Sequence, residues 1–439
     1  MDMGKPYAKA FYLLTSLFFM WGLITVLVDF LIPRLKDIFE LTYSQAILVQ
    51  FAFFIAYGLI SIPAGNMLHK IGYKKGIILG LSIMTFGCFL FMTAASVRMF
   101  SVFLIGYFTL ASGMTILQVA ANPYITVLGD PESASSRLNL AQAFNSLGTT
   151  VAPILGSVLI LSDNIKTAEE INLLDTTTKE LYYTNEASAV KFPFFFLAVS
   201  LGILAIIVIT VKLPKLIDSN TKSNYRKAIK DSKLSLGAIG IFLYVGAEVA
   251  IGSFLVNYFM DMNLADVILE NNFMKGIVSL FHENLNSIDK KAVVGTFVVF
   301  YWGGAMVGRF IGAYLTRMYK PNKVLSLFAV LAILLVSISM STSGLVALWS
   351  VLAVGLCNSI MFPTIFSIAI EDLGDLKPQG SGLLCTAIAG GAVIPLLFGF
   401  VTDMHGFNMA FIVVLCCYAY ILFYGQKSLK LNSSTLHEN

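Results

Sequence analysis

The sequence from residue 11 to residue 32 reads FYLLTSLFFMWGLITVLVDFLI, and Asp29 is its only charged residue. A helix needs about 20 mostly apolar residues to cross the hydrocarbon core of a bilayer. This stretch is longer than the apolar core of a signal peptide, which has about 7–15 residues, and no small-residue cleavage site closes it. It therefore predicts a membrane-spanning helix that is retained in the mature protein.

Similar stretches recur along the whole chain of 439 residues, of which 57% are hydrophobic and 12% are charged. Soluble domains have about 25% charged residues, so this composition indicates a protein whose solvent is the bilayer. Strand-like alternation is absent from the sequence, and backbone groups in lipid must pair within their own segment, so the long apolar runs are predicted helices. Twelve runs are long enough to span the membrane, at residues 8–32, 44–68, 76–95, 99–127, 136–161, 192–212, 235–260, 292–316, 322–341, 344–370, 380–401 and 407–425.

The distribution of positive charge predicts the orientation of these spans. With both termini in the cytoplasm, nineteen of the 29 Lys and Arg residues fall in inner segments, nine fall in outer loops, and Arg309 lies within a span. A polar inner loop divides the spans into six and six. We therefore expect an N-terminal six-helix bundle over 1–212, a cytoplasmic linker over 213–234 and a C-terminal six-helix bundle over 235–439.

The two halves of the sequence resemble each other in corresponding spans. SLGTTVAPILGS in span five resembles AIAGGAVIPLLFG in span eleven, which pairs Gly148 with Gly390. DFLIPRLKD in span one resembles SFLVNYFMD in span seven, which places Asp29 opposite Ser253. Two six-helix repeats related by an axis along the membrane normal are typical of secondary transporters, whose binding site lies between the halves near the midplane. The predicted fold is an all-α membrane protein of twelve transmembrane helices in two pseudo-symmetric bundles.

Two acidic residues lie inside predicted spans, Asp29 in span one and Glu248 in span seven. An aspartate at the centre of a membrane helix costs about 2.5–3.5 kcal/mol, so such residues normally face a partner or a water-filled cavity and mark ion or substrate pathways. We interpret both as candidates for coupling an ion to transport. The alternatives are that Asp29 anchors its helix near Arg34 or water, and that Glu248 forms a structural ion pair with Arg309.

Span five carries three amides, Asn139, Gln142 and Asn145, in the stretch RLNLAQAFNSLG. Residues three apart share one face of an α-helix. An amide both donates and accepts hydrogen bonds, as a side chain that binds sugar hydroxyls must. The alternative is hydrogen bonding between helices, worth about 0.6 kcal/mol for each contact in membranes. We favour a polar cavity lined by these amides.

Span four carries a second pair of amides, Gln118 and Asn122, at positions i and i+4. Neighbours at this spacing lie on one helix face. Gln118 is a further candidate for binding hydroxyls. Asn122 is a candidate as well, but it precedes Pro123 and could instead satisfy a backbone carbonyl that the proline leaves unpaired.

Aromatic residues within the spans could stack on the apolar face of a sugar ring. The candidates are Trp21, Tyr301 and Trp302. Most Trp and Tyr residues of membrane proteins instead anchor helices at the membrane–water interface or pack between helices.

Several classes of site find no support in the sequence. The five cysteines lie in apolar runs without metal-ligand spacing, and the four histidines lie in loops or in the C-terminal tail. No P-loop pattern and no basic stripe suited to nucleic acid occurs. We expect no metal site, no cofactor other than a coupling ion, no nucleic-acid partner and no enzymatic activity.

Specific stretches resemble a known family. GNMLHKIGYKK resembles the loop motif between spans two and three of the major facilitator superfamily, with His69 in place of the usual Asp. AANPYITVLG, RLNLAQAFNSLG and FPTIFSIAI resemble the fucose–galactose–glucose:proton symporter family, and the resemblance runs through nearly all the spans. LQVAANPY together with YVGAEVAIGSF resembles the glucose/galactose branch of that family.

This resemblance implies a sugar:cation symporter of the bacterial inner membrane that works by alternating access. Asp29 occupies the position of the family's protonation site in span one, and Gln142 and Asn145 match positions that contact sugar. The fucose member of the family has a glutamate at the position of Gln118 and an amide at the position of Glu248. The stoichiometry and the ion, proton or sodium, therefore stay open.

We expect a monomeric carrier that imports a neutral hexose, glucose or galactose first, with a proton as the coupling ion and sodium as the alternative. Asp29 would carry the ion, and Glu248 would be a second charge or a sugar ligand. Gln142, Asn145 and Gln118, and more weakly Asn139, would bind hydroxyls. The alternatives are a uniporter or exporter of another small solute, such as fucose, N-acetylglucosamine or a drug, and a polytopic membrane enzyme.

Overall fold

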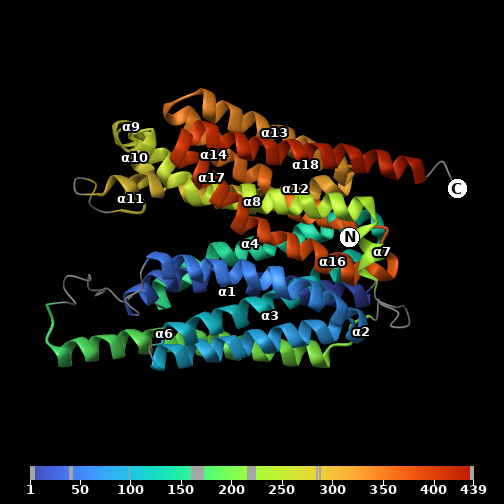
Figure 1. Cartoon of the computed structure of the whole chain (residues 1–439), viewed down its shortest axis with the longest axis horizontal. Coiled ribbons are helices and arrows are strands. Elements are labelled where there is room, and N and C mark those ends of the chain that lie inside the picture. The colour runs from blue at the N-terminus through green and yellow to red at the C-terminus, as the bar shows by residue number, and fades with distance from the viewer. Residues whose placement is uncertain are drawn as a thin grey trace. The chain divides into compact units, whose positions relative to one another are not determined.

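The computed structural model describes residues 5–38, 43–97, 99–159, 173–214, 224–282, 285 and 288–435. These residues are almost entirely helical, and no strand occurs among them. In chain order (Figure 1) the elements are α1 Lys5–Ile38, α2 Tyr43–Val97, α3 Phe100–Val127, η1 Pro131–Ser133, α4 Ala134–Leu159, α6 Thr176–Thr210, α7 Tyr225–Ile229, α8 Ser232–Asp261, α9 Leu264–Glu270, α10 Asn272–Ser279, α11 Lys290–Gly295, α12 Val298–Met318, α13 Pro321–Ser341, α14 Gly344–Asn358, α15 Met361–Ile370, η3 Gly374–Leu376, α16 Lys377–Thr386, η4 Ala387–Ala389, α17 Gly390–His405 and α18 Phe407–Thr435.

Within the described residues, ten segments are long and apolar enough to cross a membrane. One of them, Phe51–Val97, holds two helices, because the backbone of α2 is not helical at Gly72, where φ is 80° and ψ is 164°. A positive φ of this kind suits glycine, which has no Cβ. The 26-residue helix α4 adds a further long helix over the run predicted at 136–161. With α2 counted as two helices and α4 included, the twelve predicted spans are accounted for.

The chain forms two compact units, and the first, unit 1, comprises Met1–Pro131, Phe144–Ala228 and Leu373–Thr386. In this unit α2 packs against α3 and α6, and α16 packs against α2 and α3. Aromatic rings fill the contact of α2 with α3 and α6, where Phe91 stacks on Phe194 at 4.3 Å between ring centroids. Such pairs add to the free energy gained from burial alone.

The short helix α16 is seated closely on α2 in unit 1. A Cβ atom at Gly382 would lie 2.7 Å from the carbonyl oxygen of Ser61, and one at Gly65 would lie 2.7 Å from the carbonyl oxygen of Pro378. The hydroxyl of Tyr225, on α7, donates to the carbonyl of Ile62 at 2.7 Å. Two glycines that face each other thus allow the backbones of α2 and α16 to approach.

The second unit, unit 2, comprises Glu132–Ala143, Ile229–Asp372 and Ala387–Asn439. Its helix α8 packs against α15, α17 and α18, and α13 packs against α14 and α18. The helix pair α14–α15 is the most buried candidate span of the chain's described part. Each unit includes one short segment from the other half of the sequence, and the domain boundaries predicted at 212 and 235 stay a prediction.

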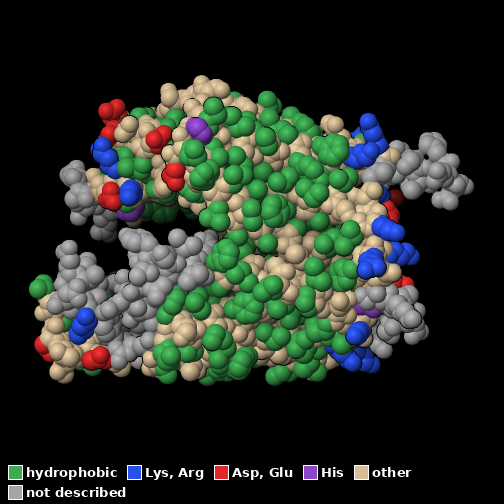
Figure 2. All heavy atoms as spheres, in the orientation of Figure 1, with side chains coloured by type: hydrophobic (Ala, Val, Ile, Leu, Met, Phe, Trp, Pro, Cys, Tyr) green, Lys and Arg blue, Asp and Glu red, His purple; other side chains and the backbone are tan. Residues whose placement is uncertain are grey.

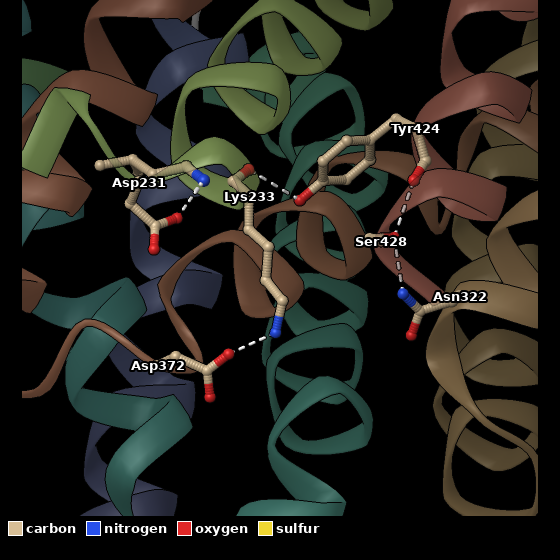
Figure 3. A network of polar contacts seen from close by, with 7 residues as sticks. Asp231, Lys233, Asn322, Asp372, Tyr424 and Ser428 are labelled. Atoms are coloured by element: carbon tan, nitrogen blue, oxygen red, sulfur yellow. Dashed lines mark hydrogen bonds and ion pairs between the residues drawn. The ribbon is translucent and has the colours of Figure 1, made fainter. Parts of the chain in front are cut away.

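A polar network fixes the beginning of α8 to its neighbours in unit 2 (Figure 3). Lys233 forms an ion pair with Asp372, which follows α15. The hydroxyl of Tyr424 donates to the carbonyl of Lys233 at 3.2 Å. Ser428 donates to the carbonyl of Tyr424 at 2.7 Å and accepts from the amide of Asn322 at 2.6 Å. The first turn of α8 is therefore held by residues of α13, α18 and the end of α15.

Large apolar side chains are exposed over much of the surface shown in Figure 2, and both units contribute such residues. Phe196 on α6 is 60% exposed and Leu334 on α13 is 52% exposed. Soluble monomers rarely expose contiguous apolar patches larger than a few hundred Å². The exposed residues are the side chains that a lipid bilayer would cover, in agreement with the composition.

Candidate functional site

The helix α1 carries two of the predicted site residues. Asp29 lies within α1, but its side chain lies outside the described residues, so its role stays a prediction. Trp21 is half-buried, and its ring meets that of Phe18 edge-on at 5.6 Å between centroids. The side chain of Trp21 thus packs along its own helix and remains partly accessible.

The amides of α3 are buried in unit 1 and incompletely paired. Gln118 is 3% exposed and donates from Nε2 to the hydroxyl of Tyr57. Its Oε1, and both side-chain atoms of the fully buried Asn122, have no conventional hydrogen-bond partner among the described residues. The thiol of Cys385, a weak donor, lies beside Asn122. An unpaired buried polar group costs about 1–3 kcal/mol, so each of these atoms requires an explanation.

The kink at Pro123 does not account for Asn122. A proline in a helix leaves the carbonyl four residues earlier without its donor, which here is the carbonyl of Val119. This oxygen accepts from the hydroxyl of Ser381 on α16 at 2.9 Å. The amide of Asn122 is therefore not used for this purpose.

The three amides of α4 differ in what they contact. In unit 1, Asn145 donates to the carbonyl of Phe18 on α1 at 2.9 Å. In unit 2, Asn139 donates to the hydroxyl of Thr364 on α15 at 3.2 Å. Gln142 is 3% exposed, and its Nε2 has no hydrogen-bond partner among the described residues. Of the three amide nitrogens, only that of Gln142 is thus left unpaired by the described chain.

Glu248 lies half-buried on α8 in unit 2, with Arg309 and the hydroxyl of Tyr244 as its polar neighbours. Arg309 donates from Nε to the carbonyl of Ser359 at 3.3 Å and from Nη1 to the carbonyl of Gln142 at 3.2 Å. Arg309 therefore connects the surroundings of Glu248 with the segment of α4 that carries Gln142. This arrangement offers a charge, donors and acceptors to a polar ligand.

The two aromatic candidates of α12 have different environments. Tyr301 is fully buried, and its hydroxyl donates to the backbone carbonyl of Glu248 at 3.1 Å. Trp302 is 46% exposed, and its ring covers Gly252, where a Cβ atom would lie 2.7 Å from the indole. Tyr301 is committed to the protein interior, whereas Trp302 presents part of its ring outward.

One buried amide of this region, Asn358 at the end of α14, was not singled out by the sequence analysis. It is fully buried and hydrogen-bonded to Tyr301 and Tyr418. An amide inside the apolar run 344–370 is the same signal that identified Asn122, so the sequence contained the information. As for metals, the described residues hold no group of three or more His, Cys, Asp or Glu side chains that could bind one.

Comparison with known proteins gives consistent matches. A family model described as "Major Facilitator Superfamily" matches residues 12–394. A glucose/galactose transporter of Brucella abortus is 49% identical over 96% of this chain and 94% of its own length. A putative glucose/galactose transporter of Helicobacter pylori is 43% identical over 95% of this chain and 96% of its own. The crystal structure of the E. coli fucose:proton symporter matches with a TM-score of 0.85 and 29% identity, over 97% of this chain and 99% of the other.

Proposed function

Because this chain belongs to the Major Facilitator Superfamily, we propose that it imports a neutral hexose, glucose or galactose first, together with a proton by alternating access. It is a multi-pass membrane protein. We place it in the bacterial inner membrane as a monomer, with both termini in the cytoplasm, because the Lys and Arg residues are concentrated in the segments that this orientation places inside.

The observation that carries the proposal is that three of the candidate amides, Gln118, Asn122 and Gln142, are buried and have unpaired atoms, as Asn139 and Gln379 also have. A buried donor or acceptor without a partner destabilises a fold, so it is retained where a ligand supplies the partner. Amides offer both donors and acceptors, which suits a ligand with several hydroxyls. The names of the Brucella and Helicobacter relatives support a hexose as that ligand.

Coupling to an ion is assigned to the acids Asp29 and Glu248. A relative from E. coli is named as an L-fucose-proton symporter, which supports the proton as the ion. Binding of ion and sugar to the same state shifts the equilibrium between states further than either does alone. A membrane potential contributes about 2.3 kcal/mol for each charge and each 100 mV, which is sufficient to accumulate the sugar.

Uptake into proteoliposomes tests the proposal directly. Purified protein is reconstituted, a proton gradient or a sodium gradient is imposed separately, and uptake of labelled glucose, galactose, fucose and N-acetylglucosamine is measured. We expect accumulation of glucose or galactose with the proton gradient only. Accumulation driven only by sodium would show the coupling ion to be wrong, and equilibration without accumulation would indicate a uniporter.

Variants of the two acids separate coupling from binding. Asp29→Asn and Glu248→Gln should each abolish accumulation of hexose while exchange of labelled for unlabelled sugar persists. Asp266→Asn is the matched control, because Asp266 pairs with Lys290 at an exposed site with 2.7 Å between Oδ2 and Nζ. Normal accumulation in Asp29→Asn or Glu248→Gln would remove that acid from the mechanism.

A further inference from the structure

The helix α8 receives tyrosine hydroxyls from neighbouring helices of unit 2 on its backbone carbonyls. An α-helix already satisfies the carbonyls of its interior, so these extra donors are not needed to form the helix. They instead attach particular points of α8 to other helices, as Figure 3 shows for Tyr424 and Lys233. The three contacts are Tyr424 to Lys233 at 3.2 Å, Tyr420 to Leu236 at 3.1 Å and Tyr301 to Glu248 at 3.1 Å.

The contact at Glu248 differs from that at Leu236 because it continues through further buried side chains. The hydroxyl of Tyr301 accepts from Nδ2 of Asn358 at 2.8 Å. Oδ1 of Asn358 accepts in turn from the hydroxyl of Tyr418 at 2.7 Å. The carbonyl of Glu248 can only accept, so the hydroxyl of Tyr301 must donate to it. That hydroxyl then accepts from Nδ2 of Asn358, which leaves Oδ1 of Asn358 to accept from Tyr418. Tyr301, Asn358 and Tyr418 are all 0% exposed.

Close packing holds the backbone of Tyr301 against α14 and brings its ring into contact with α8. A Cβ atom at Gly355 on α14 would lie 2.0 Å from the carbonyl oxygen of Tyr301. On the α8 side, a Cβ atom at Gly252 would lie 3.5 Å from the tyrosine ring. Densely packed interiors have low compressibility. The position of the Tyr301 hydroxyl relative to Glu248 is therefore well defined.

We propose that Tyr301, Asn358 and Tyr418 are positioning residues that hold the backbone of α8 at Glu248 and thereby fix where its carboxyl group is presented. The inference rests on the proposed function, in which Glu248 takes part in coupling. Buried polar chains of this kind are favourable only when every member is paired, and here each link has its partner. Tyr420 contacts α8 at Leu236, about three turns before Glu248, and holds only the first part of the helix.

The comparison of Tyr301→Phe with Tyr420→Phe tests the proposal, because each variant removes one hydroxyl and one hydrogen bond of 3.1 Å to α8. Tyr301→Phe in addition breaks the link to Nδ2 of Asn358. The rate of proton-driven hexose uptake is measured as a function of pH and sugar concentration. For Tyr301→Phe we expect a fall in the maximal rate of roughly three- to tenfold, the range set by one hydrogen bond. The pH of half-maximal uptake should also move by about half a unit or more. Tyr420→Phe should stay within about twofold of the unaltered protein at every pH.

A double variant shows whether Tyr301 acts through Glu248. If it does, Tyr301→Phe should not further change the rate of sugar exchange in a Glu248→Gln background, because coupled residues are not additive. An equal loss in both backgrounds would overturn the proposal. Tyr418→Phe removes only the far end of the chain and should shift the pH profile in the same direction but less. If Tyr301→Phe fails to fold, Tyr418→Phe serves as the test. An unchanged pH profile of uptake in Tyr418→Phe would then count against the proposal.

The outcomes distinguish this inference from the proposed function. If the unaltered protein accumulates hexose and Tyr301→Phe behaves like Tyr420→Phe, the positioning role is wrong and the transport function stands. If the unaltered protein accumulates no hexose with any gradient, the proposed function is wrong and the inference is lost with it.

Discussion

Unit 1 and unit 2 each contain, within themselves, a close helix contact at a glycine, and the sequence repeat pairs these two glycines. A Cβ atom at Gly148 would lie 2.2 Å from the carbonyl oxygen of Phe19 in unit 1, and one at Gly390 would lie 2.0 Å from that of Phe242 in unit 2. In unit 1, α4 thus approaches α1 at Gly148, and in unit 2, α17 approaches α8 at Gly390. The repeated backbone arrangement is the part of the molecule that both halves have in common.

One fully buried asparagine of each unit, Asn122 in unit 1 and Asn358 in unit 2, is partnered differently. In unit 1, the amide of Asn122 has no partner among the described residues except the weakly donating thiol of Cys385. In unit 2, the amide of Asn358 has both its nitrogen and its oxygen paired. Unpaired buried groups cost stability, whereas paired ones define a geometry. The same residue type, at the same depth of burial, is thus almost unpaired in one unit and fully paired in the other, and this contrast is the reason for proposing ligand binding for Asn122 and positioning for Asn358.

The glycine contact should produce the largest loss of stability. Gly148→Ala and Gly390→Ala should each destabilise the protein by about 3 kcal/mol or more, at the upper end of what overpacking costs. The obstructing atom is a backbone oxygen, which cannot turn aside as a side chain can. Unfolding in detergent, followed by circular dichroism or by a fluorescent thiol probe, measures the effect.

Matched controls for this prediction exist in both units. A Cβ atom at Gly202 on α6 or at Gly303 on α12 would meet no atom within 4 Å. Gly202→Ala and Gly303→Ala should therefore be neutral or stabilising by up to about 1 kcal/mol, the difference in helix propensity. A large loss at Gly390 with none at Gly148 would mean that the repeat is not preserved in packing.

The second prediction is that Asn358 and Asn122 have opposite effects on stability and on uptake when each is replaced by leucine. Asn358→Leu should destabilise the protein by about 2–3 kcal/mol, because the hydroxyl of Tyr418 loses its acceptor and that of Tyr301 loses its donor. Asn122→Leu should leave stability unchanged or raise it by up to about 1–3 kcal/mol, because it removes an amide whose only partner among the described residues is the weakly donating thiol of Cys385. Uptake of hexose should nevertheless fall about tenfold or more in Asn122→Leu. Unfolding in detergent and initial rates of uptake are measured on the same preparations.

An opposite pattern would break the comparison. A loss of stability in Asn122→Leu with normal uptake would assign Asn122 to packing between helices. Unchanged stability in Asn358→Leu would mean that the chain to Glu248 is not held by this amide.

The helical architecture and the family could be predicted from the sequence because they depend on local signals. Apolar runs of sufficient length identify the spans, and AANPYITVLG and RLNLAQAFNSLG identify the family, which is confirmed by matches over nearly the whole chain. The pairing of Gly148 with Gly390 needed only a weak repeat. The role of Asp29 stays a prediction, since its side chain lies outside the described residues.

The partners of the polar residues could not be predicted in the same way. A sequence shows that Asn122 and Asn358 are amides within apolar runs, but which of them is paired depends on side chains far away in the chain. Ser381 pairs with the carbonyl of Val119, which is 262 residues earlier. No local pattern contains such a contact, because it is made by tertiary packing.

The third prediction concerns this contact between Ser381 and the carbonyl freed by Pro123. Ser381→Ala should destabilise the protein by about 1–2 kcal/mol, because a buried carbonyl loses its only extra-helical donor among the described residues. Ser367→Ala in unit 2 is the matched control. Ser367 is also buried but donates to the carbonyl of Thr364 in its own helix, at 3.0 Å. Its removal should cost less than about 0.5 kcal/mol, and equal losses in the two variants would contradict the role given to Ser381.

We expect the smallest effect at the helix caps of the two units. These are Asp175 before α6 and Asp231 before α8. Asp175 accepts from the amides of Thr177 and Thr178 at 3.0 Å and 3.1 Å, whereas Asp231 accepts from the amide of Leu234 at 2.8 Å. The hydroxyl and amide of Thr178 are the main groups that lower the pKa of Asp175 below its ordinary value of 3.8. Aspartate and asparagine are both good N-caps, and alanine is a poor one.

Hydrogen exchange of the first turn of α6 measures the strength of the Asp175 cap. Because the pKa of Asp175 is lower in the folded protein than in the unfolded one, the cap contributes fully above about pH 4 and is lost as the pH falls through the folded pKa. Protection of the Thr177 and Thr178 amides should therefore decrease on acidification in the unaltered protein. Asp175→Asn should keep the protection without this pH dependence, and Asp175→Ala should lack it at every pH. Equal protection in Asp175→Ala and Asp175→Asn would mean that α6 begins without help from this side chain.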